Sequence, residues 1–126
     1  MVIVDTSVWV TALQVEASEE RAEVARLLAR GDAALVGMIL VEILRGSRNQ
    51  ADYDRLHDRL FGAEFIETGQ STWLRAAQLL LDLRQRGDSI PVTDALIAAH
   101  ALESGHSVYT TDNDFQRVPG LQLHVV

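Results

Sequence analysis

Short apolar segments alternate with longer amphipathic ones along this chain, and that alternation constrains the fold more than any other feature. The segments expected to form strands are 2–4, 33–36, 64–66, 107–110 and 121–126. Strands separated by helices favour a parallel sheet, because each connection crosses a face of the sheet before the next strand begins. We therefore expect an α/β protein with a short parallel sheet flanked by helices on both faces.

The intervening segments carry helix signals. The expected helices are 7–14, 19–30, 38–45, 52–61, one that opens at Thr68 or Ser71 and runs toward Gly87, and 94–104. Ser18 and Thr93 are expected N-caps, since a hydroxyl oxygen there can accept a backbone N–H of the first turn. No linker or repeat interrupts the 126 residues, so residues 1–126 are expected to form one domain.

Acidic residues occupy related places in this pattern. Asp5 ends the first strand, Asp94 begins a helix, and Asp112 follows the strand at 107–110. Glu42 lies one turn inside the helix after the second strand. Positions of this kind converge at the carboxyl end of a parallel sheet. Asp114 is two residues beyond Asp112 and is a possible fifth member of the same group.

Carboxylates gathered at one place repel one another, and the group stays ionised at neutral pH only when a cation neutralises it. A site made of oxygen ligands alone suits Mg²⁺ or Mn²⁺. One or two such ions would bind a phosphate oxygen and activate a water molecule for hydrolysis. An acid not fully used as a ligand, Glu42 or Asp112, would orient that water. We therefore predict a metal-dependent nuclease.

Each acid also has a separate structural explanation. Asp94 alone would favour the helix dipole, Asp112 and Asp114 would form a turn, and Asp5 would cap the first helix. Glu42 is the hardest to explain in this way, because its neighbours are apolar and an unpaired buried carboxylate is costly. One shared site accounts for all of these positions together.

Composition excludes several kinds of chemistry. The absence of cysteine removes disulfides, thiolate metal sites and thiol nucleophiles, and all 11 basic residues are arginine, which removes a P-loop lysine. A net charge of −7 argues against a passive nucleic-acid binder, which needs a basic face. Particular arginines would then have to hold an anionic substrate, and the candidates for phosphate are Arg45, Arg48, Arg86 and Arg117. Arg86 also has a plain alternative as a solvated charge at a helix end.

Two further expectations concern location and the histidines. The N-terminus does not look like a signal peptide, and no apolar stretch has the length of a membrane span, so we expect a cytoplasmic protein without a membrane partner. The four histidines are scattered and none is spaced to pair with an acid of the predicted site. We expect them to be structural.

The acids and their neighbours resemble the PIN-domain family, and within it the VapC-type toxins of bacterial toxin–antitoxin pairs. The matching segments are Val4-Asp5-Thr6-Ser7, Val41-Glu42-Ile43-Leu44-Arg45-Gly46, Thr93-Asp94-Ala95-Leu96-Ile97-Ala98-Ala99 and Thr110-Thr111-Asp112-Asn113-Asp114-Phe115. The resemblance implies an endoribonuclease whose acidic quartet is Asp5, Glu42, Asp94 and Asp112. It also implies supporting hydroxyls at Thr6 and Thr110.

The same resemblance implies partners: an RNA substrate, a VapB-type antitoxin that blocks the site, and a second copy of the chain. The apolar surface of the helices at 52–61 and 72–83 is the expected place for a two-fold interface. Two other functions remain open at this stage. One is a Mg²⁺-dependent phosphatase or phosphotransferase that forms an aspartyl-phosphate on Asp5, and the other is a non-catalytic domain whose acidic cleft binds a basic peptide.

Overall fold

A computed structural model describes residues 1–126 and contains one parallel sheet of four strands. The strands are β1 (Val2–Val4), β2 (Ala33–Val36), β3 (Glu64–Ile66) and β4 (Ser107–Tyr109), and they lie side by side in the order β3-β2-β1-β4. All three strand pairs are parallel. The predicted α/β class is confirmed.

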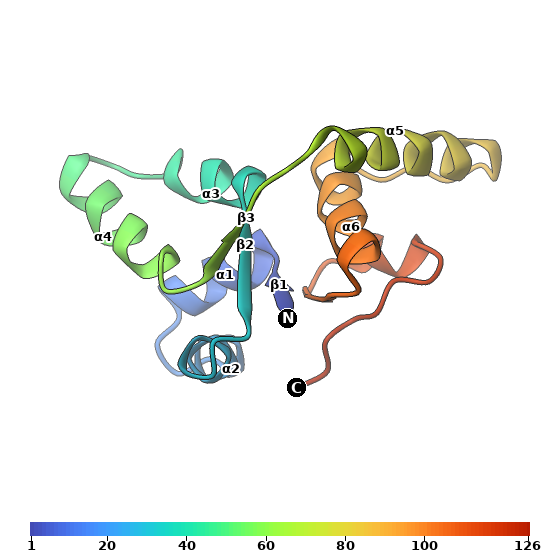
Figure 1. Cartoon of the computed structure of the whole chain (residues 1–126). Coiled ribbons are helices and arrows are strands. Elements are labelled where there is room, and N and C mark those ends of the chain that lie inside the picture. The colour runs from blue at the N-terminus through green and yellow to red at the C-terminus, as the bar shows by residue number, and fades with distance from the viewer.

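Helices cover both faces of the sheet. In Figure 1, α1 (Thr6–Gln14), α2 (Glu19–Ala29), α3 (Gly37–Leu44) and α4 (Gln50–Leu60) lie on one side. On the other side lie α5 (Gln70–Gln85) and α6 (Val92–Ser104), which pack against each other. A short 3₁₀ helix, η1 (Asn113–Arg117), follows β4 and contacts α6. Sequence reasoning did not anticipate η1.

The core encloses the two central strands and the helix that carries Asp94. Every residue of β1 and β2 is buried, as expected for strands that are covered on both faces. Helix α6 is buried without interruption from Asp94 to Ala101, so it runs through the interior instead of over the surface. Burial on all sides fixes the position of this helix, and therefore the position of its first-turn acid.

Two predicted helix starts are wrong. Helix α5 begins after Gly69, whose carbonyl accepts the N–H groups of Thr72 and Trp73, and neither Thr68 nor Ser71 caps it. Helix α6 begins after Pro91, whose carbonyl accepts the N–H of Ala95, so Thr93 lies inside the first turn. Proline suits this entry because its φ is already fixed near the helical value.

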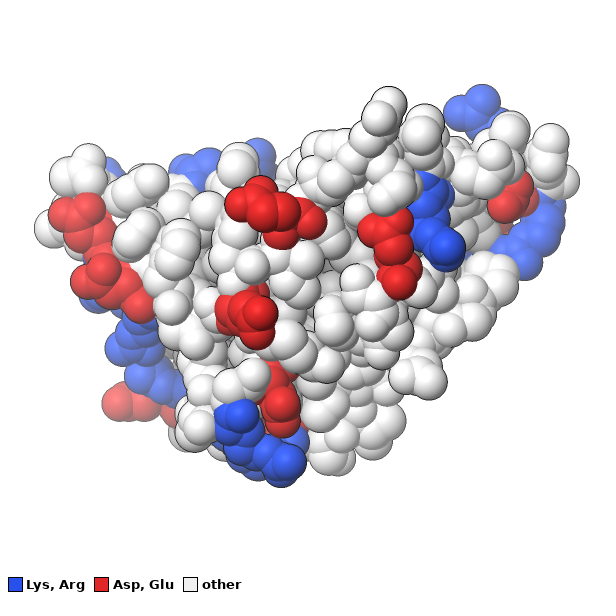
Figure 2. Space-filling model, viewed as in Figure 1, with Lys and Arg blue, Asp and Glu red and all other residues white.

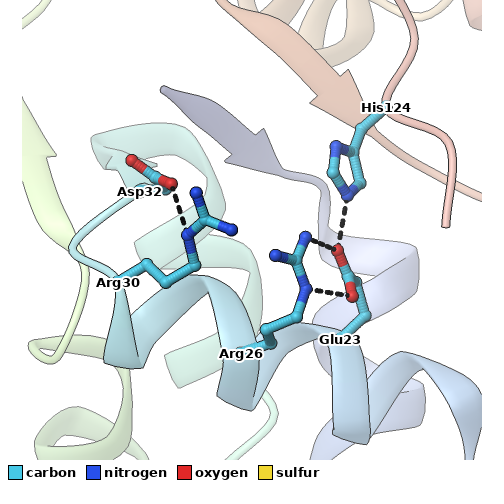
Figure 3. Close-up of polar contacts among 5 residues, drawn as sticks. All are labelled: Glu23, Arg26, Arg30, Asp32 and His124. Atoms are coloured by element: carbon cyan, nitrogen blue, oxygen red, sulfur yellow. Dashed lines mark hydrogen bonds and ion pairs between the residues drawn. The ribbon is translucent and has the colours of Figure 1, made fainter.

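The C-terminal residues form one isolated bridge instead of the predicted strand at 121–126. Val108 donates its N–H to the Gln122 carbonyl at 3.0 Å and accepts the His124 N–H at 2.8 Å. Beyond this point a side-chain contact holds the segment: His124 Nε2 lies 2.7 Å from Glu23 Oε1, and Arg26 binds both oxygens of Glu23 (Figure 3). The segment therefore lies along the outer edge of β4.

Charged side chains are mixed on the surface. On the face shown in Figure 2, arginines and acidic residues alternate with broad uncharged areas, and no continuous basic patch is visible. None of the helices combines the length and the apolar character that crossing a bilayer would require.

Candidate metal centre

The carboxyl ends of the strands bring the predicted acids toward one end of the sheet. Asp5 directly follows β1, and its carbonyl accepts the first N–H groups of α1. Glu42 lies in α3, which begins immediately after β2. Asp94 is in the first turn of the buried helix α6, and Asp112 follows β4 and precedes η1. Each acid is thus placed by a different helix or strand of the fold.

Three of the acids form a close group, here called the acidic triad: Asp94, Asp112 and Asp114. One carboxylate oxygen from each lies within 4.8 Å of the others. Asp94 is buried, Asp112 is half-buried and Asp114 is 28% exposed, so the group opens to solvent on one side. Such an arrangement of oxygens is suited to one small cation.

The surroundings of Asp94 stabilise the ionised form of its carboxyl poorly. Its side chain is only 7% exposed, and its Oδ2 atom is buried without a hydrogen-bond partner. Burial, together with repulsion from Asp5, Asp112 and Asp114, raises the pKa of Asp94 to about 7. A divalent cation would supply the missing partner and remove the repulsion. The residues present therefore fit a metal ion.

Asp5 belongs to the same end of the sheet but is held by hydroxyl groups. Ser7 and Thr110 each donate a hydrogen bond of 2.9 Å to its Oδ2 atom. Thr110 also accepts the N–H of Asp112 at 2.9 Å, so one hydroxyl links Asp5 to the segment that carries the triad. Thr110 was expected as a supporting hydroxyl from resemblance. Ser7 was not, although its position two residues after Asp5 brings it back over the strand end.

Glu42 is outside the close triad. Its Oε1 atom accepts a 3.0 Å hydrogen bond from Thr6, the other expected supporting hydroxyl. Glu42 also lines a hollow of about 470 Å³ between α1, α3 and α4, together with Val10, Ile43 and Arg48. The four acids chosen from the sequence therefore divide into a tightly grouped pair, Asp94 and Asp112, and two residues with their own hydroxyl partners.

The two acids after β4 differ in their contacts. Asp112 Oδ1 accepts the N–H of Asp114 at 2.9 Å, which caps η1. A turn was the structural explanation for both acids, and its side-chain hydrogen bond is accepted by Asp112. The carboxylate of Asp114 lies 3.3 Å from a guanidinium nitrogen of Arg117. Both acids still contribute an oxygen to the triad.

The candidate phosphate-binding arginines differ in whether their side chains already contact other groups of the chain. Arg45 is exposed at the end of α3, while Arg48 lies 3.6 Å from Asp52. Arg86 donates to the Arg117 carbonyl at 3.2 Å, and Arg117 donates to the Ser89 carbonyl at 2.9 Å. Arg86 and Arg117 are thus already engaged within the chain, which the sequence did not indicate.

The histidines contact groups away from the triad. His100 pairs with Thr68 at 2.8 Å, His106 lies 3.3 Å from the N-terminal nitrogen, and His124 binds Glu23. His57 lies 3.5 Å from Asp58 and stacks on Phe61. Each histidine therefore has its contacts outside the acidic triad, as expected from the spacing.

An α/β fold with a parallel sheet, and with carboxylates clustered at the carboxyl end of that sheet, is typical of proteins that bind a metal ion through oxygen ligands. Comparison with known families makes the assignment specific: the family model described as PIN domain matches residues 2–121. The chain belongs to the PIN-domain family.

Curated relatives span nearly the whole chain. It is similar to Ribonuclease VapC18 of Mycobacterium tuberculosis, with 33% identity over 94% of this chain and 87% of the relative. It is also similar to Ribonuclease VapC11 of the same organism, with 31% identity over 97% of this chain and 96% of the relative.

Solved structures support the fold. The chain matches VapBC2 from Rickettsia felis, a crystal structure with a promoter DNA fragment, with a TM-score of 0.84 and 24% identity over 98% of both chains. It matches FitAcB from Neisseria gonorrhoeae with a TM-score of 0.80 and 20% identity, over 98% of this chain and 97% of the other.

Proposed function

We propose that the protein is a metal-dependent endoribonuclease and the toxin of a toxin–antitoxin pair, with residues 1–126 acting as one PIN-like nuclease domain. The observation that carries the proposal is the acidic triad, in which the buried Asp94 has an oxygen without a partner. Membership of the PIN-domain family and the similarity to proteins named as VapC ribonucleases support the reaction.

The metal of this proposal is Mg²⁺ or Mn²⁺, because every donor at the site is a carboxylate or hydroxyl oxygen. Asp94, Asp112 and Asp114 are the residues that would hold it, with Asp5 next to them. When bound, the ion supplies charge for a phosphate oxygen and lowers the pKa of a water molecule.

The chain's own residues prepare the reaction by fixing these acids. Ser7 and Thr110 both hold Asp5 through Oδ2, so Oδ1 would be the oxygen that it offers to the ion. Thr6 holds Glu42 through Oε1, so the other oxygen of Glu42 is available to orient the attacking water. Preorganisation of this kind lowers the reorganisation needed in the transition state. Attack of water on the phosphorus, with departure of the 3′-oxygen, leaves a 5′-phosphate and a 3′-hydroxyl and does not use the 2′-hydroxyl of RNA.

The substrate contacts proposed here depend on individual arginines, since the charge of −7 gives no general attraction for RNA. Arg45 and Arg48 come shortly after Glu42 in the chain, and Arg48 lines the same hollow as Glu42. They are the first choice for binding phosphates flanking the cleaved bond. Arg86 and Arg117 already donate hydrogen bonds to backbone carbonyls of the chain, so they are the second choice for binding substrate phosphates.

The proposal includes two protein partners and a compartment. A VapB-type antitoxin would block the site with a basic segment, which the acidic end of the sheet attracts. A second copy of the chain would cover the exposed apolar face of α5, where Trp73 is 51% and Leu74 is 63% exposed. Because the substrate is cellular RNA, the proposed location is the cytoplasm.

Cleavage of total RNA in Mg²⁺ or Mn²⁺ tests this function. The parent should cleave, and Asp94→Asn should not, although circular dichroism shows both folded. Asp82→Asn is the matched control, because it removes the same charge from an exposed position on α5. Equal cleavage by the parent and Asp94→Asn would reject the nuclease assignment at this site. A phosphoenzyme trapped on Asp5 would instead favour a phosphotransferase.

A further inference from the structure

Arg117 places a fixed positive charge at the edge of the acidic triad. Its Nη1 atom donates to the Ser89 carbonyl at 2.9 Å, in the loop between α5 and α6. The same atom lies 3.3 Å from Asp114 Oδ1, and the carbonyl of Arg117 accepts a hydrogen bond from Arg86. The Ser89 carbonyl therefore holds the guanidinium in addition to Asp114, and Arg86 holds the backbone of the same residue.

Asp114 is consequently shared between two kinds of positive charge. Its carboxylate belongs to the triad, whose oxygens lie within 4.8 Å of one another, and it also pairs with Arg117. A divalent cation on the triad would lie close to the guanidinium and would be repelled by it. It would also have to draw Asp114 from an existing ion pair.

We propose that Arg117 competes with the metal ion for Asp114. Its guanidinium neutralises Asp114 in the metal-free protein and weakens the affinity of the acidic triad for divalent cations. This inference rests on the proposed metal site and concerns its regulation: the charge of Arg117 raises the ion concentration that is needed to occupy the triad. Arg117 thereby stabilises the metal-free fold, because its positive charge offsets the repulsion among the three carboxylates.

Arg117→Gln removes the charge of Arg117 and keeps an amide donor on a shorter side chain. The expected result is a Mn²⁺ dissociation constant lower by roughly threefold to tenfold, since an exposed charge is screened but acts within a Debye length. Without metal, the variant should melt below the parent, because the triad has lost its internal cation. Arg117→Lys keeps the charge and should bind Mn²⁺ nearly as the parent does.

Arg84→Gln is the matched control. Arg84 is exposed in the last turn of α5, so its replacement changes the net charge equally without touching the triad. Isothermal titration with Mn²⁺ and thermal unfolding in a chelator should show no change for this variant. Both measurements are independent of RNA cleavage.

The outcomes separate this inference from the proposed function. Tighter Mn²⁺ binding by Arg117→Gln, with Arg117→Lys and Arg84→Gln close to the parent, supports competition. Unchanged or weaker binding by a folded Arg117→Gln overturns it while the metal site stands. Should the parent itself fail to bind Mn²⁺, the metal site and the competition are both rejected.

Discussion

Replacing Asp94 by asparagine should stabilise the metal-free protein while it destroys the metal site. The carboxyl of Asp94 is buried, has an oxygen without a partner, and faces other acids. Asparagine has nearly the same shape but no charge, so it removes the repulsion without leaving a cavity. Its amide also brings donors toward the neighbouring carboxylates of Asp5 and Asp112.

The magnitude follows from the pKa of Asp94. An ordinary aspartate has a value of 3.8, and burial together with neighbouring acids raises the pKa of Asp94 to about 7. At about 1.4 kcal/mol for each tenfold change in proton affinity, ionised Asp94 costs the metal-free fold on the order of 4 kcal/mol. This is an upper limit for the gain in Asp94→Asn, because the buried amide has a desolvation cost of its own.

The pH dependence has a definite sign. Because the folded state raises the pKa, the protonated carboxyl is favoured in the fold, and its contribution is complete below pH 3.8. That contribution is lost as pH rises toward 7 and beyond. The advantage of Asp94→Asn over the metal-free parent should therefore be near zero below pH 3.8, grow across this window and level off above about pH 7.

Urea unfolding in a chelator, from pH 4 to pH 8, measures this difference. At pH 7.5 we expect Asp94→Asn to be more stable than the parent by about 1 to 4 kcal/mol. Addition of Mg²⁺ should stabilise the parent and leave the variant unchanged, since a ligand stabilises only the state that binds it. Asp82→Asn should behave as the parent. Equal metal-free stability of Asp94→Asn and the parent at every pH would refute the reasoning.

Three other predictions follow from separate parts of the structure. Asp112→Asn should abolish RNA cleavage with the fold intact, whereas Asp114→Asn should leave measurable activity, because the Asp114 carboxylate is already paired with Arg117; the reverse order of rates would show that Asp114 is the more important metal ligand of the two. Glu23→Gln should destabilise the protein by about 1 to 3 kcal/mol at pH 7, because the buried Glu23 carboxylate loses the charge that binds the exposed Arg26 guanidinium and His124. Since these partners lower the pKa of Glu23 from 4.5 to about 2, the difference in urea unfolding should shrink as pH falls across that interval; a constant difference would argue against the ion pair. Leu74→Glu, on the exposed face of α5, should convert the proposed dimer to a monomer in light scattering, and an unchanged mass would place the interface elsewhere.

The sheet and most helices could be predicted because local pattern and burial agree. Strands β1 and β2 are short apolar runs in the sequence and fully buried in the fold, and Ser18 caps α2 as expected. The C-terminal segment could not be predicted in the same way. Its place depends on the contact of His124 with Glu23, which are 101 residues apart in sequence and adjacent only after folding.

For the site, the sequence indicated which end of the sheet the acids share, but not which oxygen atoms pair. Spacing could not show that hydroxyls of Ser7 and Thr110 take one oxygen of Asp5, or that Thr6 takes one of Glu42. Nor could it show that Arg117 reaches the Ser89 carbonyl across a loop. These contacts depend on side-chain directions that tertiary packing alone decides.

The central claim is that the acidic triad holds the divalent ion used for RNA cleavage. Crystals of the protein grown with Mn²⁺ and measured at a wavelength where manganese scatters anomalously would test it most directly. We expect an anomalous peak within bonding distance of carboxylate oxygens of Asp94 and Asp112 in the parent and no such peak in Asp94→Asn. A parent that cleaves RNA but shows no peak at the triad, or a peak that persists unchanged in Asp94→Asn, would contradict it.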